Sequence, residues 1–298
     1  MSALVHLKSA SSEAWIDPAG AEAVDWRVGG RKLLWTADPA IWARTAPILF
    51  PIVGRARDGN IRVADRLYPM LIHGFAASSM FDVVERSEYR VRLGLRDSPE
   101  TRASFPFPFR LDIEYRVTPA ALTVALTVRN PGDGDLPYAA GWHPGFAFPF
   151  SDTGRAGHVV EFEKAEPAEV PVITAAGLFS PARRTIPIEG NRLPITDDLM
   201  AREALCFLNT RSRSVRLIAP DGAAIRVDFE DFPHLALWSR DSAPFLCIEA
   251  WTGYGDPDGF DGDIFAKPSM RILPPGGEAR HTATTSFEGA QIGLTPTA

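Results

Sequence analysis

Two histidines of the sequence stand in apolar, glycine-rich surroundings where an imidazole could carry acid–base chemistry. His73 is followed by Gly74 in the stretch LIHGF, and His143 lies in the stretch GWHPGF, between two glycines and two aromatic residues. Glycine lets other groups approach closely, and a histidine framed in this way suits the floor of a concave, apolar ligand pocket. A histidine held by hydrogen bonds in a tight turn is the structural alternative for each.

Glu249 is the third candidate because it follows the apolar run PFLCI at 244–248, which has the character of a buried strand. A carboxylate is expensive to bury there unless it is paired or functional. Burial would raise its pKa toward the range of a general base, whereas a structural ion pair at the strand end is the alternative. Cys247 is expected on the same strand face, and we interpret it as a buried structural thiol.

Other catalytic and metal-binding motifs are missing from the sequence. There is no GxSxG, P-loop, HExxH or H-x-H pattern. Cys206 and Cys247 form neither a disulfide framework nor a CxxC pair. The Asp- and Gly-rich stretch 253–263 does not follow the EF-hand spacing and is interpreted as a loop. No metal and no cofactor are predicted.

The composition favours a globular protein without nucleic acid or membrane partners. Of 298 residues 45% are hydrophobic, and 31 Lys and Arg stand against 37 Asp and Glu, a net charge of −6. This acidic balance disfavours nucleic acid and anionic membranes. The longest apolar stretch, near 46–53, contains two prolines and is shorter than the roughly 20 residues of a membrane span. No signal-peptide pattern is found at the start, so we expect a cytoplasmic location.

The elements that must position these side chains are predicted to be strands. The 24 glycines and 26 prolines are spread along the chain and leave little room for long helices. Polar and apolar residues alternate in several stretches, as is typical of antiparallel sheets with one buried face. These stretches are 89–95 (with Tyr89 on the buried face), 111–117, 121–128 and 215–229, the last interrupted by a turn at 220–222.

Little else interrupts the strand pattern. Short helical turns are expected near 39–42 and 197–203, the second capped by Asp197 or Asp198. The proline-rich segment 163–193 is interpreted as an irregular excursion between strands and not as a domain boundary. We therefore predict one all-β domain over residues 1–298, a sandwich or a related two-sheet architecture.

A set of short motifs occurs in order along nearly the whole chain. They are PILFPIVGR at 47–55, Tyr68, HGF at 73–75, SFPFPF at 104–109, GWHP at 141–144, LWS at 237–239, PFLCIEAW at 244–251, Lys267 and LPPG at 273–276. In this set the chain resembles the aldose 1-epimerase (galactose mutarotase-like) family, and within it the LacX-like branch. The resemblance implies a large antiparallel β-supersandwich, in agreement with the alternation.

The resemblance also implies a mechanism. Members of the family interconvert the α and β anomers of free sugars by opening and reclosing the ring, without a metal or a redox cofactor. A glutamate takes the proton of the anomeric hydroxyl while a histidine protonates the ring oxygen. Glu249 matches the base, His143 the acid, and His73 the second histidine, which binds the sugar near the ring oxygen.

The sugar-binding residues are less clearly matched. Galactose mutarotases carry a binding arginine beyond a Gly-Arg pair, but the corresponding stretch is shorter here, which makes Arg55 the choice and Arg57 the alternative. The binding aspartate has no clear counterpart, so Asp198 and Asp228 are both candidates. Trp238 could offer an aromatic face to a sugar ring or pack in the core.

The predicted function is that of an aldose 1-epimerase (mutarotase) acting on a free, unphosphorylated aldohexose, as a monomer or homodimer. A related branch acts on hexose 6-phosphates and would need an arginine cluster for the phosphate; the sequence has Arg55, Arg57, Arg62 and Arg66 close together. A non-catalytic carbohydrate-binding module on the same fold is a second alternative. A glycoside-cleaving enzyme would need two carboxylates about 5–10 Å apart, and only Glu249 stands out.

Overall fold

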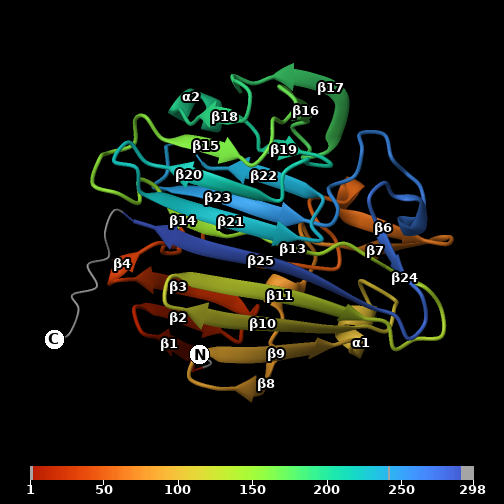
Figure 1. Cartoon of the computed structure of the whole chain (residues 1–298). Coiled ribbons are helices and arrows are strands. Elements are labelled where there is room, and N and C mark those ends of the chain that lie inside the picture. The colour runs from red at the N-terminus through yellow and green to blue at the C-terminus, as the bar shows by residue number, and fades with distance from the viewer. Residues whose placement is uncertain (1–2, 241, 290–298) are drawn as a thin grey trace.

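A computed structural model describes residues 3–240 and 242–289, and its largest element is a nine-stranded antiparallel sheet (Figure 1). The strand order is β18-β15-β20-β21-β25-β11-β10-β9-β8. The bounds are β8 (Asp82–Arg86), β9 (Arg90–Arg96), β10 (Arg110–Thr118), β11 (Ala121–Arg129), β15 (Val159–Phe162), β18 (Arg192–Pro194), β20 (Ser214–Ile218), β21 (Ala224–Glu230) and β25 (Glu278–Glu288).

A six-stranded and a four-stranded sheet oppose this layer. The six-stranded sheet has the order β19-β22-β23-β13-β5, and β14 also pairs with β23. Its strands are β5 (Ile48–Leu49), β13 (Gly141–Trp142), β14 (Gly145–Ala147), β19 (Leu205–Phe207), β22 (His234–Trp238) and β23 (Phe245–Trp251). The four-stranded sheet contains β1 (Val5–Ser9), β2 (Ser12–Asp17), β3 (Glu22–Val28) and β4 (Arg31–Lys32).

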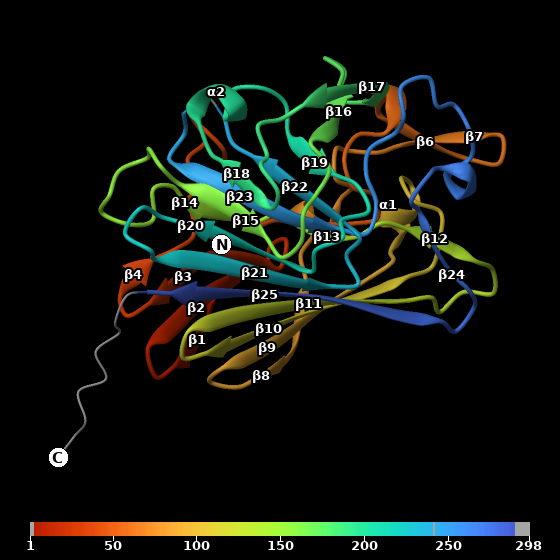
Figure 2. The ribbon, with the colours of Figure 1, turned by 45° about the horizontal axis from the view of Figure 1, so that its top comes forward.

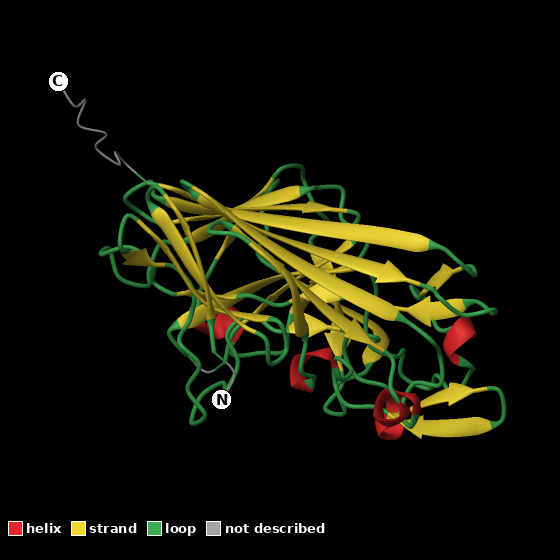
Figure 3. Cartoon of the chain, turned by 90° about the horizontal axis from the view of Figure 1, so that it is seen from below, coloured by secondary structure: helices red, strands yellow, loops and turns green. Residues whose placement is uncertain are grey.

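Three strand pairs and a few helical turns complete the described part of the chain. The pairs are β6 (Asn60–Val63) with β7 (Arg66–Pro69), β12 (Leu136–Tyr138) with β24 (Arg271–Leu273), and β16 (Glu169–Ile173) with β17 (Phe179–Thr185). The helices are single turns (Figure 3): α1 (Pro99–Arg102), α2 (Asp197–Met200), η1 (Arg57–Gly59), η2 (Ala76–Ser78) and η3 (Ile264–Ala266). Hairpins β6–β7 and β16–β17 both flank the loop 252–270 that follows β23 (Figures 1 and 2).

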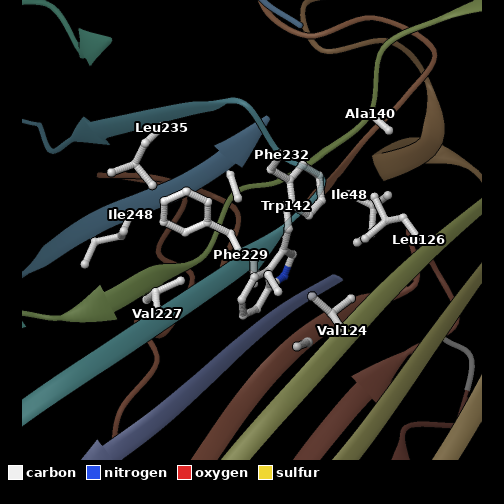
Figure 4. Packing of buried hydrophobic residues seen from close by; sticks show 14 of the residues in the cluster. Ile48, Val124, Leu126, Ala140, Trp142, Val227, Phe229, Phe232, Leu235 and Ile248 are labelled. Carbon is white, nitrogen blue, oxygen red and sulfur yellow. The ribbon is translucent and has the colours of Figure 1, made fainter. Parts of the chain in front are cut away.

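The main core lies between the nine-stranded and the six-stranded sheets. Figure 4 shows Phe229 of β21 and Val124 of β11 directed toward Leu235 of β22, Ile248 of β23 and Trp142 of β13. All five side chains are buried. The predicted all-β supersandwich is thereby confirmed, and its physical basis is the burial of one face of each sheet against the other.

The predicted alternation of buried apolar with polar side chains holds inside strands β9 and β10 and fails just before β9. Leu111 and Ile113 of β10 are buried, as are Val91 and Leu93 of β9. Tyr89 is 48% exposed and precedes β9, because the chain turns there through a hydrogen bond between residues 87 and 90. The interpretation of Tyr89 as a residue of the buried face was therefore wrong.

The segment 163–193 is more ordered than its prolines suggested, since it contains the hairpin β16–β17 and the start of β18. A shift in pairing register between Pro171 and Ile173 accommodates the proline inside β16. Near 39–42 the chain forms a turn closed by a bridge between Asp38 and Trp42, and no helix.

The helical turn expected near 197–203 is α2, but its cap was misassigned. Thr196 occupies the N-cap position, and its hydroxyl accepts the Leu199 N–H at 3.2 Å. Asp197 and Asp198 follow inside the first turn, where carboxylates interact favourably with the helix dipole. Among the described residues no helix has the length and apolar character required to cross a membrane.

Replacing Phe229 by Ala is expected to lower the free energy of unfolding by about 3–5 kcal/mol, because the ring fills the space between the two sheets. Urea denaturation followed by circular dichroism measures this change. Val84 on the edge strand β8 is 45% exposed, so Val84→Ala is the control and should change stability by less than about 0.5 kcal/mol. Equal effects of the two variants would contradict this packing.

Candidate active site

The pairing of β23 with β13 and β14 places His143 opposite Glu249. Trp142 pairs with Ala250 and Gly145 with Cys247, so the register is the same before and after the two intervening residues. His143 therefore occupies the position across from Glu249, where side chains of antiparallel strands meet. The Nε2 atom of His143 lies 3.3 Å from the Oε2 atom of Glu249.

The two faces of β23 divide its side chains between the core and the site. Leu246 and Ile248 belong to the main hydrophobic core, whereas Glu249 points to the opposite side and lines a cavity. On the other flank of β23, Ala236 of β22 pairs with Glu249. The period of two along the strand thus presents a single carboxylate to the cavity while its neighbours hold the strand in place.

Glu249 is held in an environment that disfavours its charge. It is 2% exposed, and the indole N–H of Trp251 donates a hydrogen bond of 3.1 Å to its Oε2 atom. Burial raises the pKa of Glu249 well above its usual value, and the bond from Trp251 opposes this shift only in part. The apolar surroundings therefore favour the protonated form of the carboxyl group more than water does.

His143 packs against two aromatic rings at the cavity wall. The ring centroids of Trp42 and Trp238 are 5.1 and 5.7 Å from that of the imidazole. A β-carbon on Gly145 would lie 2.7 Å from the Trp42 ring, so the glycine is what lets this indole approach. Burial, assisted by the neighbouring His73, lowers the pKa of His143 well below its usual value.

These opposite pKa shifts favour a state in which Glu249 and His143 together hold one proton. The neutral state has a protonated carboxyl and a neutral imidazole, and moving that proton gives carboxylate and imidazolium with the same total charge. Such a pair titrates as a unit. It offers one group that can accept a proton and one that can donate it, which is the requirement for acid–base catalysis without net charging of a buried site.

His73 is fixed by its backbone and by Gly54. It adopts a positive φ of 63°, and a β-carbon on the following Gly74 would come within 2.2 Å of the Phe50 carbonyl oxygen. The Gly54 N–H donates to Nδ1 of His73 at 3.1 Å, and the His73 N–H donates back to the Gly54 carbonyl at 2.8 Å. Because Nδ1 accepts, the neutral ring carries its proton on Nε2.

The charge state of His73 follows from its surroundings. Burial, with a smaller contribution from the positive charge of Arg55, lowers the pKa of His73 to about 4. Its ring centroid lies 5.5 Å from that of His143, with the two rings nearly perpendicular. At neutral pH this second histidine is therefore a neutral hydrogen-bond donor beside the proton-sharing pair.

A cavity of about 570 Å³ opens over these groups. Its volume falls in the range of small-molecule sites, roughly 300–1,000 Å³. His73, His143, Glu249 and Trp238 line it, and they are four of the five site residues expected from the sequence.

Two charged residues of the cavity wall were missed by the sequence analysis. Glu203 lines the cavity, and its Oε1 atom lies 3.1 Å from Nε of Arg184. Arg44 lines it as well, where the buried Glu22 holds its guanidinium at 3.3 Å. Neither residue stands in a motif. Glu203 follows a helical turn and Arg44 lies in a loop, and the folding of distant segments brings both to the site.

The remaining predicted binding residues do not line this cavity. Arg55 is exposed and packs against Gly177, while Arg57 lines a separate cavity of about 250 Å³.

Asp198 is exposed on α2. Asp228 alternates with the inward-facing residues of β21 and pairs with Arg226 at 2.6 Å. Neither aspartate is among the residues that line the cavity.

One group of side chains in the described residues has the ligand types of a metal site. The ligand atoms of His143, Cys247 and Glu249 all lie within 4.8 Å of one another. The thiol of Cys247 belongs to an apolar cluster with Trp35 and Phe245. Burial raises the pKa of this thiol well above its usual value, which opposes the thiolate that a metal ion would require. The same cluster fits acid–base chemistry better.

Comparison with known proteins shows the family of this chain. A family model described as aldose 1-epimerase matches residues 3–284. The chain belongs to the aldose 1-epimerase family. It is also 32% identical over 235 residues to the chromosomal LacX protein of Lactococcus lactis subsp. lactis, which covers 75% of this chain and 79% of LacX. The resemblance to the LacX-like branch is confirmed.

Solved structures of this family have the same fold. A galactose mutarotase-like protein from Lactobacillus casei ATCC 334 superposes with a TM-score of 0.90 at 29% identity, covering 96% of this chain and 100% of that chain. A galactose mutarotase related enzyme from Lactobacillus acidophilus gives a TM-score of 0.89 at 26% identity, with 97% and 99% covered. Membership in the aldose 1-epimerase family therefore supports an isomerase that acts on a sugar.

Acidification is expected to destabilise the fold through its buried histidines. Burial lowers the pKa values of His73 and His234 to about 4, whereas the unfolded chain protonates these rings near pH 6.5. Between pH 6.5 and 4 the unfolded state binds more protons, so the free energy of unfolding falls as the pH falls.

Urea denaturation of the wild type and of His234→Gln at pH 8 and pH 4.5 measures the contribution of one ring. The difference between the two proteins at pH 8 gives the cost of the lost contacts when the histidine is neutral in both states. At pH 4.5 the variant should lose less stability than the wild type, so the difference shrinks. A difference that is the same at both pH values would contradict the lowered pKa of His234.

Proposed function

We propose that this protein is an aldose 1-epimerase that interconverts the α and β anomers of a free, unphosphorylated aldohexose. The observation that carries the proposal is the pairing of His143 with Glu249 at the wall of a cavity, with 3.3 Å between Nε2 and Oε2. Ring opening of a hemiacetal needs one proton removed and one added, and this pair holds a single proton that it can relay.

In the proposed reaction the pair acts in its ionic form. The Glu249 carboxylate takes the proton of the anomeric hydroxyl, and the electrons of that O–H bond form the C1 carbonyl. The C1–O5 bond breaks as the His143 imidazolium protonates O5. Rotation about C1–C2 exposes the other carbonyl face, and O5 then attacks C1 while His143 recovers its proton and Glu249 returns the other to O1. Atoms and charge balance over the cycle.

The other groups of the cavity bind and orient the sugar in this proposal. The Nε2–H of His73 donates a hydrogen bond near the ring oxygen, on the side of His143. Trp238 and Trp42 offer aromatic faces to the C–H groups of the ring, as both line the cavity. Glu203 accepts hydrogen bonds from sugar hydroxyls. This is the binding role for which the sequence suggested an aspartate.

The placement of the arginines favours an unphosphorylated sugar. None of Arg55, Arg57, Arg62 and Arg66 is among the residues that line the cavity, and Arg57 and Arg62 lie instead at the separate cavity beside hairpin β6–β7. Arg44 lines the site but is already paired with Glu22. A phosphate would need a cluster of unengaged cations.

Replacing Glu249 by Gln is expected to reduce anomer exchange of glucose and galactose by at least about 100-fold, because the amide cannot accept the anomeric proton. Exchange is measured by NMR or polarimetry against the spontaneous reaction in buffer. Glu166 is also buried, but its carboxylate accepts the N–H groups of Arg211 and Ser212, so Glu166→Gln is the matched control. Its rate per folded molecule should equal that of the wild type.

Three other results would change the assignment. Full activity of Glu249→Gln would remove Glu249 as the base. Acceleration restricted to hexose 6-phosphates would replace the proposed substrate by a phosphorylated one. Binding of sugars without acceleration of any of them would indicate a carbohydrate-binding module on this fold.

Replacing Glu203 by Gln is expected to raise KM about tenfold and to leave kcat nearly unchanged, because a charged hydrogen-bond acceptor for a sugar hydroxyl is lost while the proton-sharing pair remains. Initial rates over a range of sugar concentrations give both constants. Glu169 on hairpin β16–β17 has a side chain 63% exposed and lies outside the cavity lining, so Glu169→Gln serves as the control. An unchanged KM in Glu203→Gln would contradict this binding role.

A further inference from the structure

A second buried ion pair lies outside the cavity that holds the acid–base pair. Lys267 and Asp256 are 4% and 5% exposed, and Nζ lies 2.9 Å from Oδ1. In the described residues this carboxylate is the only group paired with the ammonium. Burying two charges costs several kcal/mol per ion before their attraction is counted. A buried ion pair is therefore weak evidence that the two residues are there to stabilise the fold. Their contacts indicate another role.

Asp256 forms hydrogen bonds to both ends of the segment 55–57. Its Oδ2 atom accepts the backbone N–H of Arg57 at 2.8 Å, and its own N–H donates to the carbonyl of Arg55 at 2.9 Å. Oδ1 is occupied by Lys267, so the carboxylate has little freedom to turn away from the backbone. The ion pair thus fixes the position of this short segment relative to the loop after β23.

Gly54, which directly precedes this segment, sets the tautomer of His73. It donates its N–H to Nδ1 of His73 and accepts the backbone N–H of that residue. A β-carbon on Gly54 would lie 2.6 Å from the Cα atom of Gly255, so the backbones of the two loops are in contact. A shift of segment 54–57 would therefore be transmitted to the imidazole.

We propose that Asp256 is a positioning residue for His73 and that Lys267 compensates the buried charge of Asp256. By holding segment 54–57 Asp256 keeps the Gly54 N–H on Nδ1, and so keeps the Nε2–H of His73 directed to the substrate. Neither residue lines the substrate cavity. The catalytic consequence rests on the function proposed above, whereas the control of the His73 tautomer does not.

Arg57→Pro tests the link between the ion pair and the segment. Arg57 begins the turn η1 and follows Ala56 in an extended conformation, a place where proline fits. The substitution deletes the N–H that Asp256 accepts and leaves the ion pair itself intact. Arg57→Ala is the matched control, because it loses the same side chain and keeps the N–H.

The pair itself is tested by two double variants. Lys267→Met with Asp256→Ala removes both charges and the acceptor for Arg57, while Lys267→Met with Asp256→Asn keeps an oxygen that can accept this N–H. Asp112 is a buried carboxylate of the nine-stranded sheet that pairs with Arg110 at 3.1 Å. Asp112→Ala controls for the loss of a buried ion pair elsewhere in the fold.

The two readouts are the ring ¹⁵N chemical shifts of His73 and the kinetic constants for anomer exchange. In the wild type the shifts should identify Nε2 as the protonated nitrogen. In Arg57→Pro and in the Ala double variant we expect a mixture of tautomers, and kcat about 10- to 100-fold lower with a smaller change in KM. Arg57→Ala, the Asn double variant and Asp112→Ala should keep the wild-type tautomer.

The proposal fails if the wild type carries the proton on Nδ1, or if Arg57→Pro and the Ala double variant keep the wild-type shifts and kcat. A loss of thermal stability in these variants with unchanged shifts would make the ion pair purely structural and would also overturn the proposal. If the Ala double variant does not fold, Arg57→Pro against Arg57→Ala still decides. If the wild type exchanges no anomers, the proposed function fails while the ¹⁵N shifts still test the positioning.

Discussion

The contact between Glu249 and His143 across two antiparallel strands is the interaction on which this site depends. Both groups are buried, and burial acts on them in opposite directions: it raises the pKa of the carboxyl and lowers that of the imidazole. The pair can therefore remain in an apolar setting with one proton and no net charge. This is an arrangement in which proton transfer to and from a bound hydroxyl requires no rearrangement of charge in the surrounding protein.

The rest of the fold can be understood as support for this pair. A nine-stranded sheet covers one face of the six-stranded sheet, so that β23 presents apolar residues to the core and Glu249 to the cavity. Glycines at 74 and 145 allow backbone and indole groups to approach more closely than any side chain would permit. Sites built on paired strands hold their geometry better than sites on free loops. The second ion pair, Lys267 with Asp256, extends this support to the loops that carry His73.

The sequence was informative where local pattern and physical role coincide. Alternation predicted β10 and β11, and apolar surroundings together with the family motifs selected Glu249, His143 and His73. The register that places His143 opposite Glu249 had no local signal, because pairing partners are far apart in the chain. Glu203 had no signal either, because it stands in a connecting segment without a motif and reaches the cavity only in the folded chain. Asp228 could have been rejected by noting that it alternates with the buried Phe229.

The pH dependence of kcat/KM for anomer exchange tests the shared proton most directly. A proton shared by Glu249 and His143 predicts a bell-shaped profile with a broad plateau around neutral pH. Activity falls on the acid side when the pair takes up a second proton, which the lowered pKa of His143 delays to low pH. It falls on the alkaline side when the pair loses its only proton, which the raised pKa of Glu249 delays to higher pH. A rate that merely increases with hydroxide concentration, as for a reaction without an enzymatic acid, would contradict the account.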